Sequence, residues 1–312
     1  MFFSAGGKQS QDKQGSNFMA MVALAQPGPI TAAALIAEIR RAFPGYREEM
    51  KKATDGTDSG HDSVLIMMGK DVLTVIPVDR PMPPDAMDFA AGRTLFWPKA
   101  KEELARHQGH VIVAKMLSSL GNKGGLEQAR DVSMACAAIS AIVPAIGVYW
   151  SAAEMVWPAS VFREATEELM KGRVPIEAWL HLGFMRVRGD NRADAIACIT
   201  TGLQPFIGRE IEVMPTTLQP AQVAERLYGL GRYLIDKGQI LKDGETVGIS
   251  QTEKFRVALA PRGQRPDIPV IQLTLEVADQ TAGWSATKPA APAATPGFTG
   301  GFGKRTTPVK PH

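Results

Sequence analysis

Cysteine is scarce in this chain of 312 residues, which contains only Cys136 and Cys198. One pair of cysteines cannot form the disulfide framework that stabilises small secreted domains, and each lies in an apolar run typical of a buried thiol. The N-terminus also lacks the charged start followed by a long apolar run that marks a signal peptide. We therefore expect a cytoplasmic protein.

Long apolar runs and an excess of one charge are missing as well. The longest apolar stretch, residues 132–150, is interrupted by Ser133, Ser140, Pro144 and Gly147, and predicts a buried helix followed by a strand rather than a membrane span. The formal net charge is +3. Nucleic-acid binding normally needs a concentrated basic face, so we expect neither a membrane nor a nucleic acid as partner.

No complete catalytic or cofactor motif occurs in the sequence. The Gly-x-Ser-x-Gly motif of serine hydrolases is absent. The glycine-rich segment 121–125, which contains Lys123, lacks the spacing of a P-loop, and a surface turn explains it more simply than a phosphate site. We predict no cofactor and no metal. Because active sites also assemble from distant residues, the question of enzymatic activity stays open.

What the chain has is enough apolar residues, 45%, for one large domain or two smaller ones. The first half alternates strand-like and helix-like segments in the order β-α-β-β-α-β, which predicts a ferredoxin-like arrangement. The segments are strand 18–25, helix 31–43, strands 64–68 and 72–78, helix 98–107 and strand 110–116.

The second half predicts further helices and strands without a fixed repeat. They are helix 126–142, strand 146–150, helix 159–171, a hairpin of 178–188 with 195–203, strand 210–214, helix 220–237, and strands 245–250, 255–260 and 270–277. We therefore predict an α+β fold with mixed or antiparallel sheets. Its ferredoxin-like half spans 17–125 and its second α+β half spans 126–278. Residues 1–16 and 279–312 are expected to be disordered because of their Gly, Ser, Gln, Pro and Ala content.

A group of acidic and histidine residues follows Pro98. If the helix continued through Gly109, His107 and His110 would share one face, as metal ligands can, and Glu103 could orient His107. Gly109 is expected to end the helix instead, which separates the two imidazoles. The simpler interpretation is a solvated helix end followed by the first residue of a strand.

Aromatic residues form a second set of candidates. Trp179 and His181 alternate and would face one side of a strand. The tryptophans could line a groove for a ligand or a partner, although packing in the core is the default explanation. The candidates for a ligand or partner site are Trp97, Glu103, His107, His110, Lys123, Trp150, Trp179 and His181.

The C-terminal tail combines aromatic and basic residues: Phe298, Phe302, Lys304 and Arg305. Such a segment can bind a protein partner by ordering on its surface, whereas a passive solubilising tail is the plainer alternative.

Several blocks together resemble one family, the bacterial "domain of unknown function 4261". They are Phe96-Trp97-Pro98, His110-Val111-Ile112-Val113, Ile146-Gly147-Val148-Tyr149-Trp150, the stretch from Tyr228 to Tyr233, and residues 241–248. The resemblance covers roughly residues 18–260. It implies an α+β bacterial cytoplasmic protein and brings no catalytic residues with it.

From these observations we expect a non-enzymatic protein-binding or accessory module whose protein partner is unidentified. An accessory or immunity-type role in a conflict or secretion system is one concrete version. The alternative is an enzyme or small-ligand binder with a pocket near Trp97, His107, His110 and Trp150. A third hypothesis, nucleic-acid binding through the basic tail, predicts that DNA or RNA retains the protein in a salt-sensitive way.

Overall fold

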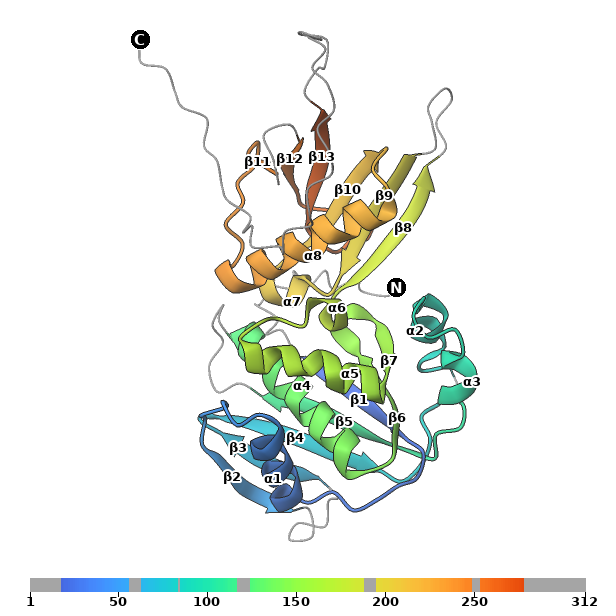
Figure 1. The fold of residues 1–312 in the computed structure, drawn as a ribbon, viewed down its shortest axis with the longest axis vertical. Coiled ribbons are helices and arrows are strands. Elements are labelled where there is room, and N and C mark those ends of the chain that lie inside the picture. Colours follow the sequence, from blue (N-terminus) through green and yellow to red (C-terminus); the bar gives the residue numbers. More distant parts are fainter. Residues whose placement is uncertain are drawn as a thin grey trace, which may run out of the picture.

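Two β-sheets with associated helices lie one above the other along the long axis of the molecule (Figure 1). The computed structural model describes residues 18–55, 63–83, 85–116, 124–187, 195–248 and 253–277. The first sheet has seven strands, and the second has six.

The first sheet is antiparallel throughout, in the order β2-β3-β4-β5-β1-β6-β7. Its strands are β1 (Met19–Leu24), β2 (Met50–Asp55), β3 (Val64–Met68), β4 (Asp71–Val78), β5 (Gly109–Met116), β6 (Ala145–Trp150) and β7 (Met155–Pro158). Strand β1 is an interior strand that pairs with both β5 and β6. It thereby joins strands from both halves of the chain.

Helices cover both faces of this sheet. Alternate residues of β1 point to opposite sides, so Val22 belongs to the core formed with α1 (Ala32–Ala42), α4 (Gly124–Ile142) and α5 (Ala159–Thr166). Its neighbour Ala23 packs instead with Trp97 and Leu104, from the segment containing α2 (Asp88–Arg93) and α3 (Ala100–Leu104). In α1, Thr31 caps the N-terminus by accepting a hydrogen bond from the Ala34 N–H.

The second sheet has the order β11-β12-β13-β10-β9-β8, with a parallel pair, β10–β13, among antiparallel neighbours. Its strands are β8 (His181–Val187), β9 (Ala195–Thr201), β10 (Glu210–Thr216), β11 (Thr246–Val247), β12 (Glu253–Ala260) and β13 (Val270–Val277). Helix α8 (Pro220–Lys237) buries Leu227, Leu230 and Leu234 in the core of this sheet. A reciprocal pair of Gln219 and Gln222 caps its start.

Aromatic side chains fill the seam between the two sheets. The rings of Trp150 and Trp179 stack with centroids 5.9 Å apart, and Trp179 stacks in turn on Phe206 at 5.6 Å. Phe206 packs against the cores of both sheets. The Trp179 Nε1–H donates to Ser133 Oγ at 2.8 Å, which ties the short helix α6 (Ile176–Trp179) to α4. The remaining short elements are η1 (Ser151–Ala153), η2 (Glu167–Lys171) and α7 (Gln204–Ile207).

The predicted α+β class with mixed and antiparallel sheets is confirmed. The arrangement within the first half differs from the ferredoxin-like one. The four predicted strands lie in the order β3-β4-β5-β1 with antiparallel neighbours, and α3 packs on the face opposite α1. A ferredoxin-like motif needs split parallel βαβ units, which this order does not provide. The second helix on the face of α1 is α4, from the predicted second half.

The change from one sheet to the other comes between β7 and β8, whereas the sequence placed the boundary at 125/126. Strands β6 and β7 therefore complete the first sheet. The segments expected to be disordered, 1–16 and 279–312, lie outside the described residues. Within the described part of the chain, no helix combines the length and apolarity needed to cross a bilayer.

Candidate functional site

Four polar residues from separate parts of the chain meet where the two sheets join. We call Arg93, Glu154, His181 and Arg265 the junction cluster. Arg93 ends α2, Glu154 precedes β7, His181 begins β8, and Arg265 lies between β12 and β13. The Arg93 guanidinium donates to Glu154 Oε2 at 2.7 Å and to His181 Nδ1 at 2.7 Å, and Arg265 donates to Glu154 Oε1 at 2.9 Å.

The backbone at Glu154 is strained. Among the described residues it is the one non-glycine with a positive φ, 52°, a conformation that costs side-chain-bearing residues free energy and often marks a functional position. Both oxygens of its carboxylate accept hydrogen bonds from the two arginines, so these ion pairs stabilise the strained turn.

Burial and the Arg93 charge determine the state of His181. Burial first, and then the nearby guanidinium, lower its pKa to about 4. The imidazole is therefore neutral at pH 7, and because Arg93 can only donate, its Nδ1 is the acceptor. Burial, reinforced by Glu154, raises the pKa of the neighbouring Tyr149 hydroxyl. The junction cluster thus holds two cations against one anion, with a neutral histidine.

Next to the junction cluster, α2 and the turn after it expose three large apolar side chains. Phe89 is 66% exposed, Leu95 83% and Phe96 70%. We call them the apolar platform. The Arg93 guanidinium lies over the Phe89 ring at 4.8 Å, and Phe96 stacks on Trp157 with centroids 5.8 Å apart. Arg93 therefore connects the apolar platform with the junction cluster.

The residues predicted around Trp97 take structural roles. Trp97 is 6% exposed and donates from Nε1 to Glu103 Oε2 at 3.0 Å. His107 accepts a hydrogen bond from the Met82 N–H at Nε2 and donates from Nδ1 to the Leu104 carbonyl. Both of its nitrogens are therefore in use, and the imidazole fixes the chain before α2.

His110 is held in a similar way. Its Nδ1–H donates to the Arg80 carbonyl at 2.9 Å, and burial lowers its pKa. Trp97 and Trp150 belong to different cores on opposite faces of the first sheet, so they do not line a shared pocket. In the part of the chain that the structure describes, no group of three or more His, Cys, Asp or Glu residues is placed to hold a metal ion.

Of the predicted candidates, His181 alone joins the junction cluster, while Trp150 and Trp179 are fully buried in the seam. Lys123 and the tail residues Phe298, Phe302, Lys304 and Arg305 lie outside the described residues. Sequence reasoning missed Arg93, Glu154 and Arg265, because nothing in their local patterns shows that they meet. The run from Thr94 to Trp97 did contain a signal for the apolar platform, because it places two large apolar residues directly before a helix.

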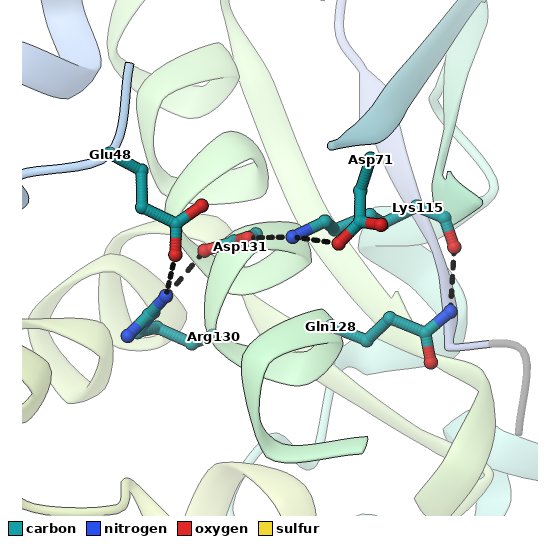
Figure 2. A network of polar contacts seen from close by, with 6 residues as sticks. All are labelled: Glu48, Asp71, Lys115, Gln128, Arg130 and Asp131. Carbon is teal, nitrogen blue, oxygen red and sulfur yellow. Dashed lines mark hydrogen bonds and ion pairs between the residues drawn. The ribbon is translucent and has the colours of Figure 1, made fainter. Parts of the chain in front are cut away.

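A buried charge network, also missed, joins the first sheet to α4 (Figure 2). The Lys115 ammonium of β5 pairs with Asp131 of α4 and with Asp71 of β4, the latter at 3.1 Å. Arg130 continues the network from Asp131 to Glu48 at 3.1 Å. Gln128 donates to the Lys115 carbonyl at 2.6 Å.

This network is a structural brace. Burial opposes the charge on Lys115, but Asp131 and Asp71 outweigh it and raise the pKa of the ammonium. The Lys115 side chain is only 1% exposed, so no ligand can reach it. The signal was present in the sequence, because Lys115 alternates with Val111 and Val113 and therefore occupies a core position of the strand.

Comparison with family models gives one match. Residues 199–274 match the model described as Domain of unknown function (DUF4261). The match confirms the resemblance inferred from the sequence, over the part from β9 to β13 that includes α8. The blocks at 228–233 and 241–248 lie inside the DUF4261 match, whereas those at 96–98, 110–113 and 146–150 precede it. Searches of curated proteins and of solved structures returned no match.

Proposed function

We propose that this protein is a non-enzymatic, cytoplasmic protein-binding module of bacterial origin, and that the apolar platform is the surface that contacts its partner. The observation that carries the proposal is the exposure of Phe89, Leu95 and Phe96 within eight residues of chain. Single exposed apolar residues are ordinary, but a group of large ones marks an interaction site in soluble proteins.

The surroundings of the apolar platform support this function. The Arg93 guanidinium lies over the Phe89 ring and is fixed there by its hydrogen bond to Glu154. The Phe96 ring stacks on the buried Trp157. Aromatic and arginine side chains held rigidly before binding are typical of residues that dominate binding energy at interfaces. Phe89 and Phe96 are thus preorganised and lose little conformational freedom on binding.

Charges beside the apolar platform are balanced, which indicates the chemistry of the partner. Lys101 pairs with Asp88 at 2.8 Å, and Lys99 and Glu102 are both exposed with opposite charges. A nucleic acid or an anionic lipid surface would be matched by a basic excess. The expected occupant is therefore a protein that presents its own apolar surface. An accessory or immunity-type role is one form that such binding takes.

Site-specific cross-linking tests this proposal. A photoreactive residue placed at Leu95 in the full chain, expressed in its native cells, should cross-link to one discrete protein that mass spectrometry identifies. The matched control is the same residue at Val161 of α5, which is 41% exposed and lies away from the apolar platform.

Titration with the purified partner then measures the contribution of the platform. Phe96→Asp should weaken binding at least about tenfold, because it places a charge in a desolvated apolar contact. Val161→Asp should leave the affinity unchanged. Equal cross-linking from both positions, or full affinity in the Phe96→Asp variant, would contradict the proposal.

A further inference from the structure

Strand β8 forms an open edge of the second sheet. Among the described strands, β9 alone pairs with it, and the register runs from His181↔Thr201 to Val187↔Ala195 without a shift. The strand is seven residues long, its one charged residue is Arg186, and it contains no proline. Phe184 at its centre is 37% exposed. A regular, apolar edge of this kind is a template for pairing with another strand.

The other three sheet edges in the described structure carry features that discourage such pairing. Edge strand β2 has Lys51 and Lys52 and a register shift between Lys52 and Thr54. Edge strand β7 has four residues and ends at Pro158, and β11 has two residues. Short edges, lysine, proline and bulges are the devices that natural proteins use against edge-to-edge association. Strand β8 lacks all of them.

We propose that β8 pairs with the β8 strand of a second copy of this chain, antiparallel and about a two-fold axis at Phe184. This register keeps all seven residues paired. Phe184 then faces its own counterpart, and such aromatic pairs across strands are stabilising. Gly183 lies opposite Met185 of the second copy, so the smallest side chain of the strand meets a long one.

The charges of β8 are compatible with this pairing. Arg186 lies opposite Leu182 of the second copy, so the two Arg186 guanidiniums are not direct neighbours, and like charges directly opposite would be destabilising. The sequence of β8 is therefore complementary to itself in the register that pairs the whole strand. This self-complementarity favours a second copy over an unrelated extended peptide.

The protection of β11 makes the assembly finite. A sheet that can extend at both edges builds an open filament, whereas a two-fold pairing through one edge closes after two copies. The dimer would have one continuous sheet running from β11 of one copy to β11 of the other. Both α8 helices would cover the same face, because an axis perpendicular to the sheet leaves each face on its own side.

Oligomeric state measured by sedimentation on the full chain tests the proposal. The wild-type chain should be a dimer in the micromolar range, and Phe184→Lys should raise its dissociation constant at least about tenfold by placing two like charges face to face. Ala258→Lys, at an exposed position of β12 opposite Gln272 in the same sheet, is the matched control and should leave the dimer intact. Phe96→Asp should also leave it intact, since the apolar platform is a separate surface.

Cross-linking keeps the proposal testable if the lysine variant fails to fold. Cys198 lies opposite Phe184 in the β8–β9 register and would compete for a new thiol there, so the cysteine variants are made in a Cys198→Ala background, where the buried Cys136 is the remaining native cysteine. In that background Phe184→Cys should form an intermolecular disulfide under mild oxidation, because residues on the axis face one another, whereas Ala258→Cys in β12 should not. A wild-type chain that is monomeric at tens of micromolar, or a dimer unaffected by Phe184→Lys and not linked by Phe184→Cys, would overturn the proposal. A monomer that dimerises only after removal of residues 278–312 would likewise overturn it, and would indicate that the tail occupies the edge of β8 in the full chain.

Discussion

At the scale of single residues, Lys115 shows how a charge is kept inside an apolar core. Its neighbours on the same side of β5, Val111 and Val113, are fully buried, and so is the Asp131 carboxylate that it meets. Removing both charges from water costs free energy, which the two carboxylates offset for Lys115, whereas for Asp131 the nearby cations offset it only in part and burial still raises its pKa. The pair is thus a device that fixes α4 on β5 in one register.

Loss of one member of this pair should be costly. Lys115→Met leaves the buried Asp131 with Arg130 alone as its cation and Asp71 without its Lys115 partner, and we expect it to lower the free energy of unfolding by about 3–5 kcal/mol. Urea denaturation followed by circular dichroism measures the change. The control is Lys101→Met, which removes an exposed pair with Asp88 and should cost at most about 1 kcal/mol.

Replacing both partners offers a second check. Lys115→Met combined with Asp131→Leu should be more stable than Lys115→Met alone, since no unpaired charge remains in that contact. A single variant that loses less than about 1 kcal/mol would show that the buried pair does not form.

Residue roles were the least accessible to sequence reasoning. The pattern Glu103, His107, His110 identified residues that are indeed held in specific hydrogen bonds. The partners of the two histidines are backbone groups of Met82, Leu104 and Arg80, which a local motif does not reveal. The predicted alternation of His181 with Trp179 on one strand was wrong, because Trp179 ends α6 and β8 begins at His181. Arg93 and Glu154 come from distant segments and could only be found in three dimensions.

At the scale of elements, the packing of α3 on β6 depends on a glycine. A Cβ atom on Gly147 would lie 2.9 Å from the Trp97 ring and 2.9 Å from the Trp157 carbonyl. Real Cβ contacts are longer, so any side chain at this position must push Trp97 away from the sheet. Trp97 fixes the start of α3, and the apolar platform directly precedes it.

We therefore expect Gly147→Ala to lower the free energy of unfolding by about 1–3 kcal/mol, as overpacking does in well-filled cores. Chemical denaturation and the tryptophan bands of near-ultraviolet circular dichroism would report it. Gly92→Ala is the control, because nothing lies within 4 Å of its added Cβ and alanine favours helix by up to about 1 kcal/mol. Equal stability of the two variants would mean that Trp97 does not pack against β6.

Most elements could be predicted from the sequence because their apolar spacing is regular. Helix α8 agrees at both ends with the predicted 220–237, and β3 and β13 agree with 64–68 and 270–277. The missed elements lack such spacing. Strand β2 is polar at an exposed edge, β7 is short and ends in proline, and α2 follows a proline-rich connection.

At the scale of the whole molecule, the seam of Trp150, Trp179 and Phe206 joins the cores of the two sheets. Because the two cores share this aromatic cluster, each sheet needs the other in place to bury its part of the seam. We expect the chain to unfold in one transition despite its size. Hydrogen exchange followed by mass spectrometry across a urea series should give the same opening free energy for β5 as for β13.

A lower opening free energy for one sheet would contradict this expectation. The variant Trp179→Leu is informative here, because it shortens the seam without placing a charge in it and should separate the two values. The matched variant Trp157→Leu alters an aromatic residue of the first core that stacks on Phe96 rather than on the rings of the seam, and should leave them equal.

Assembly of the sheets was the part of the fold that the sequence could not supply. The sequence of a predicted strand does not show which other strand it pairs with. The pairing of β1 with β6 and the parallel pairing of β10 with β13 were therefore not predicted. Both join segments that are far apart in the chain. The boundary at 125/126 followed from the order of elements alone, while spatial pairing carries the first sheet on to β7.

The two thiols can report separately on the opening of the two cores. Cys136 lies in α4 beneath the first sheet and Cys198 in β9 of the second, and both are buried. Burial raises the pKa of both thiols, that of Cys198 to about 12, so neither reacts while its core is closed. The rate at which an alkylating reagent modifies each thiol therefore reports the rate at which its own core opens. This measurement needs no substitution in the chain.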